Sequence, residues 1–260
     1  MLIDFHTHVY PDAIAPKAAD SIRKFYHLGD DYMDGRVETL LKYGDKAGVE
    51  KFVILPVSLR PTNTRHINDF IIDQVAKEPR FFGYGTIHAG MQDLCEEVEF
   101  IMANGLRGLK MHTDCQVFPI DDPRLFPVYE MAQDKLPILF HMGDRRYDYS
   151  HPARLRKVLD LFPKLQVIAA HFGGYGMYET AYENLHDKDC IFDVSSSMMF
   201  MEDGVAEKFI NIYGAERMAF GTDYPVWDPL WETELFLALD LTDDQKEQIA
   251  WKTAARFLDL

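Results

Sequence analysis

Two histidines stand one residue apart near the start of the chain, in the stretch DFHTH at residues 4–8. His6 and His8 follow a short apolar run, which is typical of a strand whose end is polar. Side chains two positions apart on a strand point to the same face, so the two imidazoles would point together. Directed into a site, they form a two-nitrogen clamp for a borderline metal such as zinc. Directed elsewhere, they are polar residues that hydrogen-bond to neighbouring loops.

Further residues of this kind close other apolar segments. His88, His112, His141 and His171 each stand at the end of one, and Asp223 stands at the end of the last. Only 10 of the 260 residues are histidine, and chance placement would scatter them. His141 and Asp223 would add a third nitrogen and a carboxylate oxygen to the N-terminal pair. Three histidines and an aspartate, with a position left for water, are a catalytic rather than a structural ligand set.

The elements that must position these residues are short apolar segments that recur along the whole chain. Each segment is almost continuously apolar, as expected of strands that are buried on both faces of a parallel sheet. They lie at residues 1–8, 51–58, 81–88, 106–113, 136–143, 165–173, 190–197 and 217–225.

Segments with helical spacing separate them, for example residues 37–48, 67–78, 124–135 and 153–162. The pairs Asp122-Pro123 and His151-Pro152 predict helix starts. Eight strands that alternate with helices predict a (β/α)₈ TIM barrel, an α/β fold of about 250 residues. An open doubly wound sheet is the competing prediction, but no glycine-rich nucleotide-binding motif follows any strand.

We expect residues 1–260 to form a single domain, because no linker, repeat or low-complexity tract interrupts the chain. The connection at residues 9–36 is long for a barrel, and we expect a short helix within it at residues 14–26. In a TIM barrel the carboxyl ends of the strands form the active-site rim. The barrel therefore explains why histidines and Asp223 stand at the ends of the segments.

An ordered set of motifs resembles the amidohydrolase superfamily. These motifs are DFHTH, GLRGLKMH, LPILFHMGD, HPARLRKVLDLFPKLQVIAAHFGG, MAFGTDYPV and the C-terminal AARFLDL. The similarity covers essentially the whole chain. It is greatest to the amidohydrolase-related branch, which includes aminocarboxymuconate semialdehyde decarboxylase and γ-resorcylate decarboxylase.

The resemblance implies a distorted barrel that holds one divalent metal. By motif, it assigns the metal to His6, His8, His141 and Asp223, and the acid/base role to His171. An imidazole has an ordinary pKa close to neutral pH and can shuttle a proton, and Asp223 would be catalytic as well as a ligand. Imidazole and carboxylate ligands favour Zn²⁺, with Mn²⁺ and Fe²⁺ as alternatives. The resemblance also suggests a homodimer.

Other residues near these motifs are candidates for the same site. Lys110 and His112 share one face of a strand, and we interpret them as neighbours of the ligands, with a metal-bridging lysine as the alternative. An arginine fork suits a carboxylate, so an arginine just beyond a strand is a candidate for binding an acidic substrate. The predicted substrate-binding residues are Arg60, Arg145, Arg146, Tyr175 and Trp227, with Phe118 and Tyr147 as further aromatic candidates.

The composition limits the partners. The net charge of −15 argues against nucleic-acid or anionic-membrane binding, because both require basic patches. Three widely spaced cysteines form no disulfide framework and no thiolate zinc site, which fits a reducing compartment. No signal peptide or apolar stretch long enough to span a membrane is evident, so we expect a soluble cytoplasmic protein.

Together these features predict a metal-dependent enzyme with a small-molecule substrate. The main prediction is a hydrolase that cleaves an ester, lactone or amide of a small carboxylate-bearing molecule through metal-activated water. The alternative is a non-oxidative, metal-dependent decarboxylase of a small unsaturated or aromatic acid. Both reactions use the same ligand set. A non-catalytic metal-binding scaffold is the minor alternative.

Overall fold

The computed structural model describes residues 1–29 and 32–260, which fall into two compact units. The first unit comprises Met1–Leu55 and Val194–Leu260, and the second comprises Pro56–Asp193. No helix among the described residues is both long enough and apolar enough to cross a membrane.

Strand β1 (Ile3–Thr7) lies at the centre of the first unit and is buried along its whole length. It pairs in parallel with β2 (Lys51–Ile54), with Ile3 opposite Lys51. On its other side, the Phe5 N–H donates to the Phe220 carbonyl (2.9 Å), and Thr7 forms a parallel bridge to Tyr224. The N-terminal histidines are therefore held beside a segment more than 200 residues away in the sequence.

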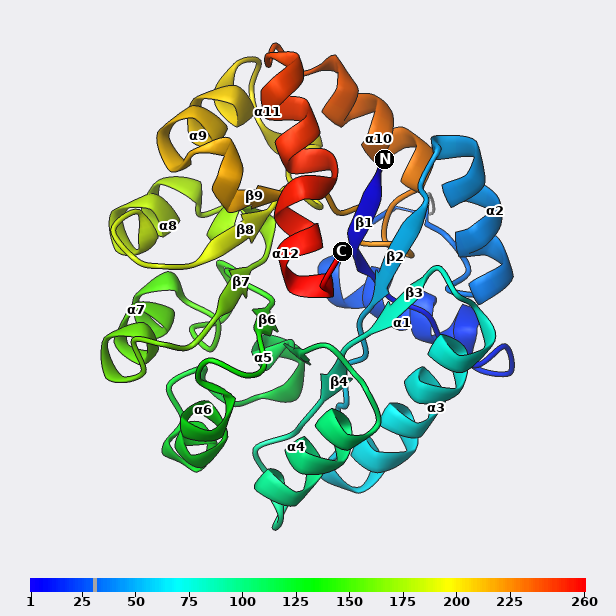
Figure 1. The fold of residues 1–260 in the computed structure, drawn as a ribbon, viewed down its shortest axis with the longest axis vertical. Helices are drawn as coiled ribbons and strands as arrows, with labels where there is room; N and C mark the ends of the chain where they lie inside the picture. The colour runs from blue at the N-terminus through cyan, green and yellow to red at the C-terminus, as the bar shows by residue number, and fades with distance from the viewer. Residues whose placement is uncertain (30–31) are drawn as a thin grey trace. The chain divides into compact units, whose positions relative to one another are not determined.

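Helices surround this centre. Within the first unit, α2 lies beside α10 and α12 lies beside β9, as Figure 1 shows. The α-helices and the further strand described for the first unit are α1 (Ala15–Tyr26), α2 (Val37–Ala47), α9 (Val205–Tyr213), β9 (Met218–Ala219), α10 (Pro229–Ala238), α11 (Asp243–Glu247) and α12 (Thr253–Leu258).

The second unit contains a parallel array of short strands in chain order, from β4 to β8. Val, Ile, Leu and Phe fill most of their positions, and these side chains are buried, as the apolar segments predicted. The strands are β3 (Phe81–Gly83), β4 (Gly85–Thr86), β5 (Leu109–Met111), β6 (Ile138–Phe140), β7 (Val167–Ala169) and β8 (Ile191–Asp193).

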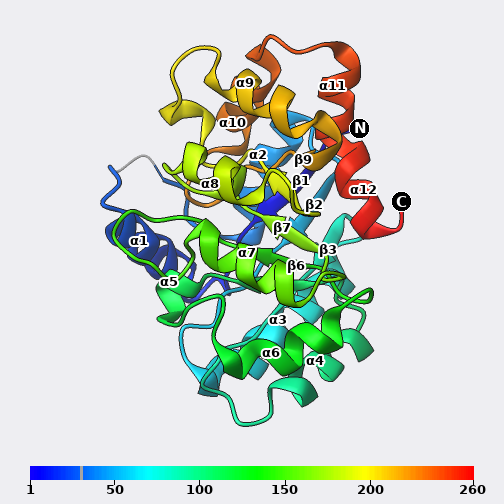
Figure 2. The same cartoon turned by 90° about the vertical axis from the view of Figure 1, so that its left-hand side faces the viewer.

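The helices of the second unit connect consecutive strands. Figure 2 shows α7 and α8, which lie side by side, and α4 is similarly adjacent to α6. These helices are α3 (Thr64–Lys77), α4 (Leu94–Ala103), α5 (Thr113–Gln116), α6 (Phe126–Ala132), α7 (Pro152–Leu161) and α8 (Tyr178–Leu185).

Each of the eight apolar segments contains a strand, but the strands are shorter than predicted. Residues 81–88 form two strands, β3 and β4, separated by Tyr84. Both predicted helix starts are confirmed: the side chain of Asp122 accepts a hydrogen bond from the Arg124 N–H, and that of His151 accepts one from the Ala153 N–H.

Helix α1 confirms the helix expected within the connection at residues 9–36, of which residues 30 and 31 lie outside the described residues.

Candidate metal centre

His6, His8 and Asp223 converge within the first unit and form the cluster that we call the HHD cluster. The two Nε2 atoms lie 3.2 Å apart. The Oδ1 atom of Asp223 lies 3.5 Å from Nε2 of His6 and 3.4 Å from Nε2 of His8. Both imidazoles are almost fully buried, and the Asp223 side chain is 13% exposed.

These separations fit three ligands of one divalent cation. Two ligand atoms about 2.1 Å from an ion, at angles of 90–110°, lie roughly 3.0–3.5 Å from each other. Two imidazole nitrogens and a carboxylate oxygen are also the donor types that zinc and manganese accept. The spacing of the HHD cluster therefore fits a metal ion, and the assignment of His6, His8 and Asp223 as its ligands stays a prediction.

The surroundings of the two rings direct both Nε2 atoms into the cluster. The Nδ1 atom of His8 lies 2.6 Å from the Leu55 carbonyl oxygen, which can only accept, so Nδ1 carries the proton and Nε2 keeps its lone pair. The Nδ1 atom of His6 contacts the Ser195 hydroxyl at 3.2 Å. Partners of this kind fix the orientation of a histidine ligand and increase its basicity.

Asp223 reaches the cluster through an unusual backbone conformation. Its φ is 57°, a left-handed value that few residues other than glycine adopt. Its N–H donates to the His6 carbonyl (2.7 Å), and the His8 N–H donates to the Tyr224 carbonyl (2.7 Å). The chain therefore leaves the extended conformation predicted for residues 217–225 and turns the carboxylate toward the histidines.

A buried carboxylate holds β1 against this turn. Asp4 is fully buried and accepts hydrogen bonds from the Thr222 N–H (3.0 Å), the Thr222 hydroxyl (2.6 Å) and the His6 N–H (3.2 Å). Beside it, Gly221 packs so closely that an added Cβ would lie 2.7 Å from the His6 Cβ. Asp4 and Gly221 thus fix the distance between the two halves of the HHD cluster.

In the second unit, His141 follows β6 and contacts His171, which follows β7. The Nδ1 atom of His141 lies 3.0 Å from Nε2 of His171, and its Nε2 atom lies 3.0 Å from the Gly143 carbonyl. Because that carbonyl can only accept, the proton of His141 is on Nε2 and its lone pair on Nδ1 faces His171. The assignment of His141 as a metal ligand stays a prediction.

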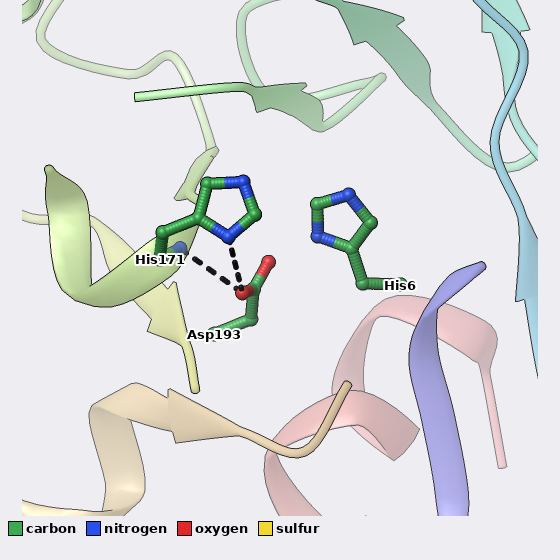
Figure 3. A group of neighbouring side chains, drawn as sticks. All are labelled: His6, His171 and Asp193. Carbon is green, nitrogen blue, oxygen red and sulfur yellow. Dashed lines mark hydrogen bonds and ion pairs between the residues drawn. The ribbon is translucent and has the colours of Figure 1, made fainter. Parts of the chain in front are cut away.

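His171 rests on Asp193, the last residue of β8, as Figure 3 shows. The backbone N–H of His171 donates to Oδ1 of Asp193 (3.1 Å), and its Nδ1 atom lies 4.0 Å from the same oxygen. Both side chains are buried. His171 and Phe172 have φ values of 59° and 54°, so two successive residues are left-handed here. Strain of this kind is found at functional sites.

His112 stacks on the His141 ring, and Asp114 lies near its Nε2 atom. The rings of His112 and His141 stack with centroids 3.8 Å apart and an interplanar angle of 6°. The Oδ2 atom of Asp114 lies 3.8 Å from Nε2 of His141. Burial raises the pKa of Asp114 to about 6, although hydrogen bonds from Ser150 oppose this shift. His112 thus packs against His141, and its role as a neighbour of a metal ligand stays a prediction.

The predicted arginines differ in what they contact. Arg146 forms a fork with the Asp144 carboxylate (2.9 and 2.6 Å). Arg145 is exposed, and its Nε atom donates to the Gly176 carbonyl (2.9 Å). Arg60 is exposed at the start of a 3₁₀ turn after β2. Since the Arg146 fork already binds a carboxylate, Arg145 is the better candidate for an acidic ligand.

The aromatic candidates and Lys110 occupy several environments. Phe118 is buried against His88, whereas Tyr147 is exposed. Tyr175 is partly buried, with its ring centroid 5.9 Å from that of His171. The Trp227 indole N–H donates to the Ser196 hydroxyl (2.9 Å). Lys110 is fully buried in β5, and its role as a neighbour of the ligands or a metal-bridging lysine stays a prediction.

Several residues that support these sites are not among the candidates predicted from the sequence. Asp193 directly follows the apolar run at residues 190–192, inside the segment at residues 190–197, so the placement that indicated the histidines would also have indicated Asp193. Asp4 lies inside DFHTH, beside the histidines that it positions. Ser195 and Ser196 carry no comparable signal, because serines at strand ends are common turn residues.

Comparison with known proteins identifies the family. The amidohydrolase family model matches residues 3–260. The chain belongs to the amidohydrolase family. The recognition made from the motifs is confirmed, and so is the expectation of an enzyme of this family.

One relative of this amidohydrolase-family chain is 2-amino-3-carboxymuconate-6-semialdehyde decarboxylase from Dictyostelium discoideum. The two sequences are 25% identical over 239 residues, which cover 75% of this chain and 66% of the relative. The match therefore spans slightly less than two thirds of the relative's length.

Solved structures show the same fold over the whole chain. An uncharacterized TIM-barrel protein from Bordetella bronchiseptica has a TM-score of 0.82 at 22% identity, covering 99% of this chain and 98% of its own. Another is a dihydroxybenzoic acid decarboxylase from Polaromonas sp. JS666, solved with bound manganese and the inhibitor 2-nitroresorcinol. It has a TM-score of 0.78 at 16% identity, covering 100% of this chain and 97% of its own. The predicted TIM-barrel fold is confirmed.

Proposed function

We propose that this amidohydrolase-family protein is a metal-dependent decarboxylase of a small aromatic or unsaturated acid. The observation that carries the proposal is the HHD cluster, in which two imidazole nitrogens and a carboxylate oxygen converge. The relatives favour the decarboxylase alternative over the hydrolase prediction, since both characterised relatives are named decarboxylases.

The residues that would hold the metal are His6, His8 and Asp223, and the sequence pattern adds His141 as a proposed fourth ligand. When bound, a divalent ion polarises the oxygens of an acidic substrate and offsets their charge. The manganese in the Polaromonas enzyme supports a divalent ion. Zinc remains our proposal from the donor types, with manganese and iron as alternatives.

His171 is the proposed proton donor. Decarboxylation breaks the bond between the substrate carbon and its carboxylate, CO₂ leaves, and a proton must be added to that carbon. Nε2 of His171 carries a proton, because it faces the Nδ1 lone pair of His141, and Asp193 accepts a hydrogen bond from the His171 backbone N–H. The imidazole of His171 can therefore supply the proton that the substrate carbon needs. The side chains of His171 and Asp193 are buried, which keeps bulk water away from both.

Arg145 is the proposed contact for a substrate carboxylate or phenolate. Its guanidinium is exposed, and the Gly176 carbonyl binds only its Nε atom. The remaining N–H groups can form a charge-assisted pair with an acid. Arg60, Tyr175 and Trp227 stay predicted substrate-binding residues, as do the homodimer and the cytoplasmic location.

The test is a turnover assay on metal-free and reloaded protein. Protein stripped with a chelator and reloaded with Mn²⁺ or Zn²⁺ is mixed with dihydroxybenzoic acids and with 2-amino-3-carboxymuconate semialdehyde, the acids that its relatives' names indicate. We expect CO₂ release and loss of substrate absorbance only with metal. Hydrolysis of esters or lactones, with every acid left intact, would instead support the hydrolase that the sequence first predicted.

A further inference from the structure

A chain of hydrogen bonds leads from an indole to the carboxylate of the HHD cluster. The Trp227 Nε1–H donates to the Ser196 hydroxyl (2.9 Å), and this hydroxyl donates to Oδ2 of Asp223 (2.5 Å). The other carboxylate oxygen, Oδ1, is the atom that faces the two imidazoles. This series of hydrogen bonds therefore ends on Oδ2, the oxygen of Asp223 that does not face the histidines.

The direction of this chain is fixed by chemistry. An indole nitrogen can only donate, so the Ser196 oxygen must accept from Trp227. The single hydroxyl proton of Ser196 is then free to be donated to the nearby Asp223 oxygen, which as a carboxylate can only accept. A bond to an ionised carboxylate is short and strong, as the 2.5 Å distance indicates.

Both donors are held in place from outside the cluster. The Ser196 N–H donates to a carboxylate oxygen of the buried Glu232 (3.2 Å), and Ser196 itself has a left-handed φ of 52°. The Trp227 ring packs edge-on against Phe200 and Trp231, with centroids 5.8 and 5.5 Å away. A serine kept in a conformation that costs free energy suggests that its side chain is needed there.

We infer that Ser196 and Trp227 are positioning residues that lock Asp223 for metal binding through Oδ1 alone. The inference rests on the proposed metal centre. It gives Trp227 a role through Ser196 and Asp223, which differs from the direct substrate contact that the sequence predicted. Outer partners of metal ligands typically change metal affinity by about 10- to 100-fold.

The test uses Ser196→Gly, which removes the hydroxyl while glycine accepts the left-handed backbone without strain. We expect the metal-free variant to stay folded and to unfold cooperatively, since relief of the left-handed strain partly offsets the two lost hydrogen bonds. Its dissociation constants for Mn²⁺ and Co²⁺, measured by calorimetry, should rise about 10- to 100-fold. The visible spectrum of the Co²⁺-loaded variant should also change, because the carboxylate can rotate.

Trp227→Phe removes the indole N–H but keeps an aromatic ring, and Trp231→Phe is its matched control. Trp231 is 40% exposed and lies beside Trp227. We expect Trp227→Phe to weaken metal binding by less than Ser196→Gly does, and Trp231→Phe to leave it unchanged. Equal losses in the two tryptophan variants would mean that ring packing, not the N–H, supports the site, and would overturn the role of Trp227.

The outcomes separate this inference from the proposed function. Wild-type affinity and an unchanged Co²⁺ spectrum in Ser196→Gly would overturn the inference, provided that Asp223→Asn loses the metal. If Asp223→Asn also binds metal normally, the proposed metal centre fails and the inference fails with it. If the wild-type protein binds metal and Ser196→Gly weakens binding, but no acid is decarboxylated, only the proposed reaction is wrong.

Discussion

The Nδ1 atom of His8 lies 2.6 Å from the carbonyl oxygen of Leu55, the residue that follows β2. The contact fixes the tautomer of His8 and leaves its Nε2 lone pair directed at Asp223. Because β1 and β2 are hydrogen-bonded neighbours, the sheet itself orients one ligand of the proposed metal. Substitutions in β1 and in the segment before Asp223 therefore test the proposed metal centre.

Replacing His6 with alanine should remove the metal and the activity together. The substitution deletes one of the two nitrogens of the HHD cluster. Metal content per chain, measured by mass spectrometry after dialysis, should fall with turnover. Full retention of metal would exclude His6 as a ligand.

Replacing His171 with alanine should separate metal binding from catalysis. A lost general acid lowers the rate by about 10²- to 10⁴-fold, whereas the HHD cluster stays intact. Metal content and kcat are measured on the same preparation. A rate equal to that of the wild-type protein would refute the proposed proton transfer.

Asp4→Asn should destabilise the first unit. The Asp4 carboxylate accepts three hydrogen bonds from Thr222 and His6, and an amide would place a donor group against some of these donors. We expect the free energy of unfolding to fall by about 1–3 kcal/mol, measured by urea denaturation. Unchanged stability would show that Asp4 does not hold β1 to Thr222.

Gly221→Ala should weaken both stability and metal binding. The added Cβ would lie 2.7 Å from the Cβ of His6 and 3.2 Å from its backbone nitrogen, so β1 must move. Overpacking of this kind costs about 1–3 kcal/mol. Gly29→Ala is the matched control, since, among the described residues beyond its chain neighbours, no atom lies within 4 Å of its added Cβ. Equal effects of the two substitutions would argue against a specific contact with His6.

Asp122→Asn should reveal a pH-dependent contribution to stability. Hydrogen bonds from the Arg124 side chain lower the pKa of Asp122 below its ordinary value of 3.8, although burial opposes this. Because its pKa is lowered in the folded state, Asp122 stabilises the protein at pH values above 3.8. This stabilisation is lost as the pH falls through the folded-state pKa.

We therefore expect the free energy of unfolding of the wild-type protein to exceed that of Asp122→Asn by up to about 1 kcal/mol at pH 7. The difference is small because Arg124 is largely exposed, and solvent screens the ion pair. The difference should vanish in strong acid, where the carboxyl is protonated in both states. Urea denaturation at several pH values measures it. A difference that is independent of pH would contradict the assigned cause.

The sequence by itself determined the alternation of apolar segments and helices, the helix starts at Asp122 and His151, and the His6–His8 pair. These features are local: strand and helix periodicity, caps and two-residue alternation depend on neighbours in the chain. The motifs also identified the family, because they recur in order along the whole length.

Only the tertiary structure decided which atoms meet. Asp4 bonds to Thr222 across 218 residues, and Ser196 bonds to Asp223 across 27, contacts that no local pattern encodes. Asp223, Ser196 and His171 also adopt left-handed conformations in the parts of the apolar segments that lie beyond the ends of β9, β8 and β7. Long-range hydrogen bonds compensate for such strained conformations, so their positions depend on the folded chain rather than on the residues beside them.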